Sequence, residues 1–143
     1  MENNIVKEIY DLRHLIHCYA SDGDDLRKHM NVTQFQVMMY LFRHEKDDVC
    51  QKDLESEIHL TKASITGCLD SLEDMGFVQR VRAQDDRRKK IIILTKKASS
   101  VKNKFHERFE KLNAQLLHDI SDDDLAAFYR VAGMIEKNLS RKA

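Results

Sequence analysis

The side chains best suited to chemistry in this sequence are the cations of one segment. Between Phe77 and Lys104, ten lysines and arginines are opposed by only two carboxylates, those of Asp85 and Asp86. The whole chain has a formal net charge of zero, so the remainder is correspondingly acidic. This asymmetry indicates one face built for phosphate groups and other surfaces kept away from them. The ten cations are Arg80, Arg82, Arg87, Arg88, Lys89, Lys90, Lys96, Lys97, Lys102 and Lys104.

No catalytic centre is recognisable in the sequence. No nucleophile, base and orienting group stand at usable spacing, and there is no glycine-rich phosphate loop, so we expect no enzyme. The three cysteines are an odd number in a chain without a recognisable secretory signal, which argues against a disulfide scaffold and favours the cytoplasm. The longest aliphatic run, residues 91–94, is far too short to cross a membrane.

Seven histidines raise the alternative of a metal or redox sensor. His14, His17 and Cys18 lie within one predicted helical turn, and His106 lies on a helix that could pass near them in a dimer. Surface histidines and a packed, unreactive cysteine are the commoner explanation for such residues. We therefore predict no metal and no cofactor, and keep metal or redox sensing as an alternative.

The elements that hold the basic segment are predicted to be mainly helical, because the chain has no proline and only four glycines. Two helices separated by a turn at residues 59–60 are typical of a helix-turn-helix. The second of them begins after Thr61 as its cap, and Gly76 lies where helices commonly end in a left-handed residue. Thr33 and Gln36 form a predicted capping box for the helix before this pair. Apolar residues at helical spacing place the helices at 5–19, 33–44, 51–58, 61–75, 95–116 and 121–139.

After Gly76 the pattern changes from helix to strand. Residues 77–82 alternate between apolar and polar side chains, 84–90 are polar and strongly charged, and 91–95 are mostly β-branched and apolar. Two short strands around a charged tip predict a β-hairpin, which we call the wing. The predicted fold class is therefore mainly α with a small β-hairpin wing: a winged helix-turn-helix flanked by N- and C-terminal helices.

From Asn31 to Thr95 the sequence resembles the MarR (multiple antibiotic resistance regulator) family. The order and spacing of the matching pieces fit that family throughout. The pieces are Val32–Phe35, Gln51–Leu54, Leu60–Thr66, Leu72–Arg80, Asp85–Arg88 and Leu94–Thr95. The resemblance implies a single domain over 1–143, with a winged helix-turn-helix core at 31–95 and helical dimerisation regions at 1–30 and 96–143. A departure is Cys50, which stands where the family often has Ser or Thr as a helix cap, and which is a poorer cap.

The resemblance also implies a function. It indicates a sequence-specific transcription regulator that binds double-stranded DNA at a pseudo-palindromic operator. Such a protein acts as a homodimeric repressor, and a small apolar or anionic effector would change its affinity for DNA. A winged-helix module that binds proteins and has lost DNA binding is an alternative from another class, although the intact basic wing argues against it.

The helix predicted over 61–75 is the recognition helix by this resemblance. If Ile65, Leu69 and Leu72 face the core, helical geometry puts Ala63, Thr66, Gly67 and Asp70 on the outside. An ordinary surface helix is the alternative. The expected contacts with base edges come from Thr61, Lys62, Ala63, Ser64, Thr66 and Gly67. The expected phosphate contacts at the start of the preceding helix come from Gln51 and Lys52.

In the wing, the resemblance matches an Asp-x-Arg pattern to Asp86 and Arg88. It implies that Arg88 enters the minor groove while Asp86 orients its guanidinium. The neighbouring cations would add phosphate contacts that depend on salt but not on sequence. An exposed ion-pair cluster, or charges that protect the edge of a hairpin, are the alternatives. The predicted wing contacts are Arg80, Arg82, Asp86, Arg87, Arg88, Lys89 and Lys90.

The first, penultimate and last helices carry apolar stripes that are too long for the small winged core to cover. We therefore predict a homodimer that buries these stripes. The residues expected at its interface are Ile9, Ile16, Phe105, Phe109, Phe128 and Ile135.

Overall fold

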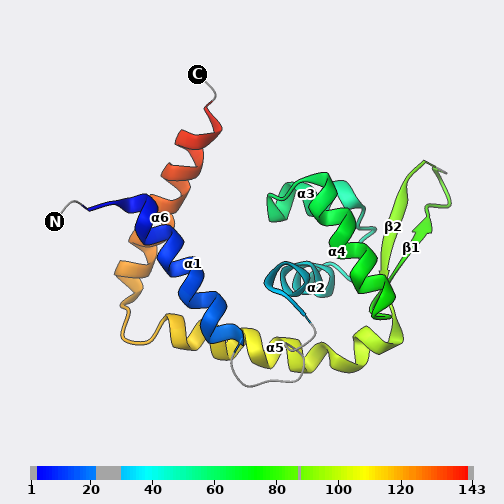
Figure 1. Cartoon of the computed structure of the whole chain (residues 1–143), viewed down its shortest axis with the longest axis horizontal. Helices are drawn as coiled ribbons and strands as arrows, with labels where there is room; N and C mark the ends of the chain where they lie inside the picture. Colours follow the sequence, from blue (N-terminus) through cyan, green and yellow to red (C-terminus); the bar gives the residue numbers. More distant parts are fainter. Residues whose placement is uncertain (1–2, 22–29, 87, 142–143) are drawn as a thin grey trace. The chain divides into compact units, whose positions relative to one another are not determined.

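The computed structural model describes residues 3–21, 30–86 and 88–141, which form six helices and a two-stranded antiparallel sheet (Figure 1). The chain divides into two compact units, Met1–Glu107 and Arg108–Ala143. The predicted fold class is confirmed, and each helix begins and ends within two residues of its predicted bounds. In chain order the elements are α1 (Ile5–Ser21), α2 (Val32–Arg43), α3 (Gln51–Ile58), α4 (Lys62–Asp74), β1 (Val78–Arg82), β2 (Lys90–Leu94), α5 (Lys96–Leu116) and α6 (Asp122–Ser140).

The capping box of α2 lies two residues earlier than predicted. The Asn31 side chain accepts a hydrogen bond from the Gln34 backbone N–H (2.8 Å), and the Gln34 side chain accepts one from the Asn31 N–H (2.9 Å). The predicted pairing of Thr33 with Gln36 is therefore wrong, because Asn is as good a helix cap as Thr and stands first in the chain.

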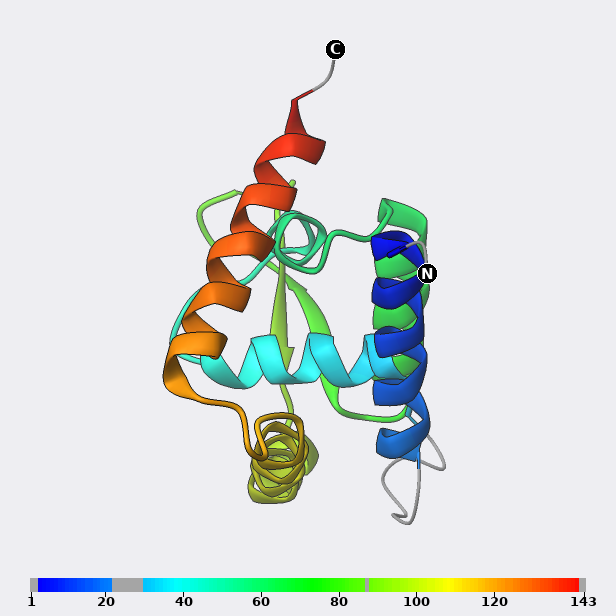
Figure 2. The ribbon, with the colours of Figure 1, turned by 90° about the vertical axis from the view of Figure 1, so that its left-hand side faces the viewer.

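The core of the first unit is built around α2. Helices α3 and α4 pack against α2 (Figure 2), and β1 packs against α4. From α5, Phe105 inserts its ring between Phe35 and Phe42, with centroid distances of 5.2 and 5.4 Å. The largest fully buried side chains are those of Phe105, Met38, Leu54, Ile65, Leu69, Leu72, Val37 and Val78.

The wing is fastened to the helix-turn-helix along one of its strands. Strands β1 and β2 pair so that Val78 lies opposite Leu94 and Arg82 opposite Lys90. On its other edge β2 is hydrogen-bonded to the segment before α3: the Ile92 N–H donates to the Val49 carbonyl (2.8 Å). Strand β2 is thus held between β1 and the start of the helix-turn-helix.

The junction between wing and helices is a compact set of hydrogen bonds. Gly76 has a left-handed φ of 81°, as predicted, and the Phe77 N–H reaches back to the Leu72 carbonyl (2.9 Å) to close the end of α4. The Thr95 hydroxyl donates to the Gly76 carbonyl (2.5 Å) and accepts from the Ala98 N–H (3.3 Å). One side chain therefore links the end of α4, the end of β2 and the start of α5.

The second unit contains α6, whose first turn carries three aspartates after the Ser121 cap. The Ser121 hydroxyl accepts from the Asp124 N–H (3.1 Å), and the carboxylates suit the positive end of the helix dipole. None of the residues of α6, all of which the structure describes, is buried. Large apolar side chains such as Phe128 (60% exposed) remain open to solvent. No helix in the described part of the chain is long and apolar enough to span a membrane.

Candidate nucleic-acid interface

Helix α4 presents the face that the sequence predicted. Thr61 caps it: the Thr61 hydroxyl accepts from the Ser64 N–H (3.2 Å) and donates to the Ser64 hydroxyl (2.9 Å). Its inner side chains, Ile65, Leu69 and Leu72, are fully buried, so the predicted orientation of the helix is confirmed. The residues on the opposite side leave a small, polar surface that a base edge could approach closely. Thr61, Lys62, Ala63, Ser64, Gly67 and Asp70 are exposed, and Thr66 is half-buried.

Two of the predicted contact residues are bonded to each other. The Gln51 amide donates to the Thr66 hydroxyl (2.8 Å) and to the Glu55 carboxylate (3.2 Å). The Thr66 hydroxyl in turn donates to the Lys62 carbonyl (2.8 Å). The Gln51 side chain therefore holds the N-terminal half of α4 on α3, while Lys52 remains exposed at the start of α3.

The weak cap expected at Cys50 is compensated by Asp53. The Asp53 carboxylate accepts hydrogen bonds from the Cys50 backbone N–H (2.9 Å) and from the Cys50 thiol (3.2 Å). The backbone hydrogen bond from Cys50 is the main cause that holds the pKa of Asp53 below its ordinary value, against the effect of partial burial. Asp53 therefore satisfies the backbone N–H of the N-cap residue Cys50, which is the half of a capping box that the third residue of a helix supplies.

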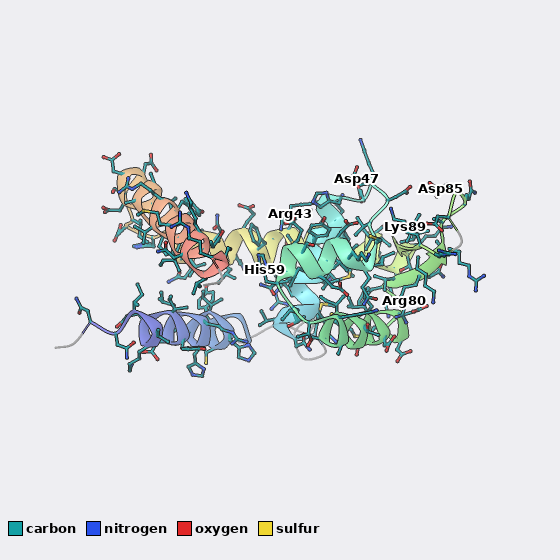
Figure 3. All side chains as sticks on the ribbon, turned by 90° about the horizontal axis from the view of Figure 1, so that it is seen from above. Arg43, Asp47, His59, Arg80, Asp85 and Lys89 are labelled. Atoms are coloured by element: carbon teal, nitrogen blue, oxygen red, sulfur yellow. The ribbon has the colours of Figure 1, made fainter. Side chains whose placement is uncertain are left out.

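Arg80 does not extend toward solvent as a free phosphate contact. Its Nε donates to the Glu73 carboxylate (2.7 Å) and its Nη2 to the Asp70 carboxylate (2.6 Å), so it lies between the wing and α4 (Figure 3). Burial lowers the pKa of Arg80, but the two hydrogen bonds outweigh burial and raise it overall. The Arg80 guanidinium is thus paired with two carboxylates of α4, and its predicted contact with phosphate stays a prediction.

The tip of the wing is closed by its own backbone. The Ala83 N–H donates to the Lys89 carbonyl (2.8 Å), and the Lys89 N–H to the Asp86 carbonyl (3.1 Å). The Asp86 carboxylate accepts from the Arg88 backbone N–H (2.9 Å), which shapes the turn as such side chains commonly do. This bond fixes the backbone of Arg88, while the role of Asp86 in orienting the Arg88 guanidinium stays a prediction.

The remaining cations of the wing are open to solvent. Arg82, Arg88, Lys89 and Lys90 are exposed, and Figure 3 shows Asp85 and Lys89 on the same hairpin. Arg87 lies outside the described residues. These cations need no internal partner to be stable at the surface, so they are available to phosphate groups.

Asp70 and Glu73 were not predicted from the sequence to pair with Arg80. They stand three residues apart on α4, and Asp70 is on its outer face. A carboxylate on a face expected to meet phosphates requires a nearby cation, and that conflict was the signal that could have pointed to Arg80.

The predicted dimer residues divide into two groups. Ile9, Phe109 and Phe128 are exposed, and Ile16 and Ile135 are half-buried. Phe105 is 1% exposed and packs inside the first unit, so we move it from the predicted dimer surface to the core of its own chain.

The histidines and cysteines that the structure describes do not gather into a ligand set. His14 and Cys18 lie one turn apart on α1, with 3.5 Å between Nε2 and Sγ. Within residues 3–21, 30–86 and 88–141, no group of three or more His, Cys, Asp or Glu side chains could hold a metal ion.

Solved structures of transcription regulators share this fold. The Staphylococcus aureus MepR–DNA complex has a TM-score of 0.87 at 18% identity, over 96% of this chain and 98% of that one. A MarR transcriptional regulator from Methanosarcina mazei Go1 has a TM-score of 0.77 at 22% identity, over 95% and 96%. The regulator MarR from Oenococcus oeni PSU-1 has a TM-score of 0.72 at 20% identity, over 93% and 96%.

The sequence itself matches a family of regulators. The family described as transcriptional regulator SarA/Rot matches residues 25–105, more than half of the chain. The matched range includes the helix-turn-helix, the wing and the first half of α5. The resemblance to MarR regulators is thereby confirmed at the level of the fold, and the chain belongs to the SarA/Rot family of winged-helix transcriptional regulators.

Proposed function

We propose that this chain is a sequence-specific repressor that binds double-stranded DNA as a homodimer and releases it when a small-molecule effector binds. The observation that carries the proposal is the outer face of α4, where Lys62, Ala63, Ser64 and Gly67 are all exposed, as are the cations of the wing. A helix with so little bulk on its outer face can enter the major groove closely, while exposed arginines suit the narrow minor groove.

In this proposal the chain acts as one functional domain over 1–143. Residues 31–95 form the DNA-binding core, and 1–30 with 96–143 form the dimerisation region. The exposed apolar side chains on α1, and separately those on α6, support this division, because exposed apolar patches commonly mark an interface. Two recognition helices related by a two-fold axis would read half-sites about one helical turn, roughly 34 Å, apart.

The proposal places the protein in the cytoplasm and assigns it no catalytic step. Family membership supports both points, since its relatives are described as transcriptional regulators. The effector is implied by the resemblance to MarR regulators, and its chemistry is expected to be apolar or anionic.

Selection of bound sequences from a randomised double-stranded DNA library tests the proposal. We expect the wild-type chain to enrich a pseudo-palindrome and to bind it at a stoichiometry of two chains per duplex. Arg88→Ala should weaken binding, whereas the matched control Lys104→Ala should not, because Lys104 is an exposed cation of the same segment placed on α5. Failure to enrich any sequence would contradict DNA readout and favour a protein-binding module.

A further inference from the structure

The outer side of α4 is joined to the wing by one polar cluster. Arg80 on β1 donates to Glu73 (2.7 Å) and to Asp70 (2.6 Å), which lie three residues apart on α4. We call these three residues the Arg80 clamp. The Arg80 side chain is 24% exposed, so the cluster is partly shielded from water, and its hydrogen bonds run to charged acceptors.

The clamp lies near the base of the wing, so a small change of angle there displaces the far end of the wing. Arg80 is four residues beyond the turn at Gly76, or about 13 Å at 3.3 Å per residue, while Arg82, at the end of β1, is six residues beyond it, or about 20 Å. A rotation of roughly 10° at the turn would move the end of β1 by about 3.5 Å over that length. Recognition sites tolerate only about 0.5 Å of misplacement, so the direction of the wing has to be held somewhere along its length.

The charges of the clamp suit a contact within the protein better than a contact with DNA. Asp70 is exposed on the side of α4 that carries Ala63 and Gly67, where it would repel phosphates if it stood alone. The two carboxylates of the clamp outnumber its single guanidinium, which leaves no spare positive charge for a phosphate. Burial and hydrogen bonding therefore commit Arg80 to α4.

We propose that Arg80 is a positioning residue that holds the wing in register with the recognition helix without touching DNA. The inference rests on the proposed function and deepens it. In this arrangement the exposed cations of the wing tip reach the minor groove only when the clamp fixes the angle between β1 and α4. Loss of the clamp leaves every predicted DNA contact chemically intact but displaces the tip relative to α4.

The test uses the full chain and two labelled duplexes: the sequence most enriched by the wild-type chain and a scrambled duplex of equal length. The variants are Asp70→Asn with Glu73→Gln, Arg80→Met and Arg80→Lys, each checked by thermal melting. We expect the Asn/Gln double variant and Arg80→Met each to lose about tenfold or more in affinity for the enriched duplex, the loss typical of a misplaced contact. Binding to the scrambled duplex should change much less.

Two readouts separate the clamp from its alternatives. If only surface charge mattered, removing two negative charges would tighten binding, which is the opposite sign. If Arg80 contacted a phosphate, Arg80→Met would reduce the slope of log K against log salt by about 0.9, and Arg80→Lys would restore it. We expect an unchanged slope and little rescue by Lys, because an ammonium cannot reproduce the two-pronged contact of a guanidinium.

The inference is overturned if the Asn/Gln variant binds the enriched duplex as tightly as the wild type, or if Arg80→Met lowers the salt slope. Since the Asn/Gln changes are nearly isosteric, they test the clamp even if Arg80→Met unfolds. A wild-type chain that enriches no DNA sequence would contradict the proposed function itself. A wild-type chain that prefers the enriched duplex, with variants that prefer it equally, would contradict only the role of the clamp.

Discussion

The Phe105 ring is the largest of the α5 side chains that pack in the core of the first unit. It is 1% exposed, and it stacks against Phe35 and Phe42 at centroid distances of 5.2 and 5.4 Å. Truncating a buried Phe to Ala costs about 3–5 kcal/mol, because a cavity term adds to the lost transfer free energy. Each aromatic pair contributes about 0.5–1.5 kcal/mol beyond its buried area. We therefore expect Phe105→Ala to lower the free energy of unfolding by about 4–5 kcal/mol, the upper part of the range.

Phe109, one helical turn further along α5, provides the matched control. It is 39% exposed and belongs to the proposed dimer surface. Phe109→Ala should cost little within one protomer but should raise the Kd of the dimer. Denaturant unfolding at two protein concentrations, combined with sedimentation equilibrium, separates the two effects because association depends on concentration. For Phe105→Ala we expect a lower unfolding midpoint at both concentrations and an unchanged dimer Kd.

Two results would refute this reasoning. The first is an unfolding midpoint of Phe105→Ala equal to that of the parent. The second is a rise in dimer Kd as large as the one caused by Phe109→Ala, which would mean that Phe105 contributes to the dimer interface. Phe105→Leu leaves a smaller cavity and should cost distinctly less than Phe105→Ala, which ties the loss of stability to packing.

Further predictions concern the wing, the recognition helix and the cysteines. Asp86→Ala should weaken binding to the enriched duplex although it removes a negative charge, while Asp86→Asn, which can still accept from the Arg88 N–H, should bind nearly as the parent does; titration of labelled duplex checks both. Gly67→Ala should stabilise the free protein by up to about 1 kcal/mol in thermal melts, since its new Cβ would meet no atom within 4 Å. Gly67→Arg should keep the fold and change affinity or sequence preference; identical binding to enriched and scrambled duplexes as in the parent would show that Gly67 does not face the groove. Burial raises the pKa of the Cys68 thiol from 9.0 to about 11, so at pH 8 its thiolate is about a hundredfold scarcer than that of an unburied cysteine. Thiol labelling of the native chain should therefore modify exposed Cys18 quickly and Cys68 only after unfolding.

The helices and the wing were predictable because their signals are local. Apolar spacing located Ile65, Leu69 and Leu72 on the inner face of α4, and Gly76 marked its end, since both depend only on neighbours in the chain. The start of α2 was misplaced because Asn31 and Thr33 are both good caps. Only the hydrogen bonds of the folded backbone decide between them.

The candidate site was harder to predict where it depends on contacts between elements. The pairing of Arg80 with Asp70 and Glu73 was not predicted, because these carboxylates lie on a different element. Phe105 was read as a dimer residue because a helical stripe does not tell which of its apolar side chains pack within the protomer. A charge pattern or a hydrophobic period identifies one face of a helix or strand. Which residues that face contacts depends on the tertiary structure.

The hydrogen bonds of Thr95 determine which side of α5 faces the core of the first unit. Because Thr95 is the one residue between β2 and α5 and also caps α5, no further residue between the two elements can absorb a change in chain length. Adding one residue there would turn the whole of α5 by about 100° and advance it by about 1.5 Å. Because α5 carries Phe105, this ring would rotate away from its contacts with Phe35 and Phe42. Insertions should therefore be tolerated at the tip of the wing, near Asp85, and rejected at Thr95.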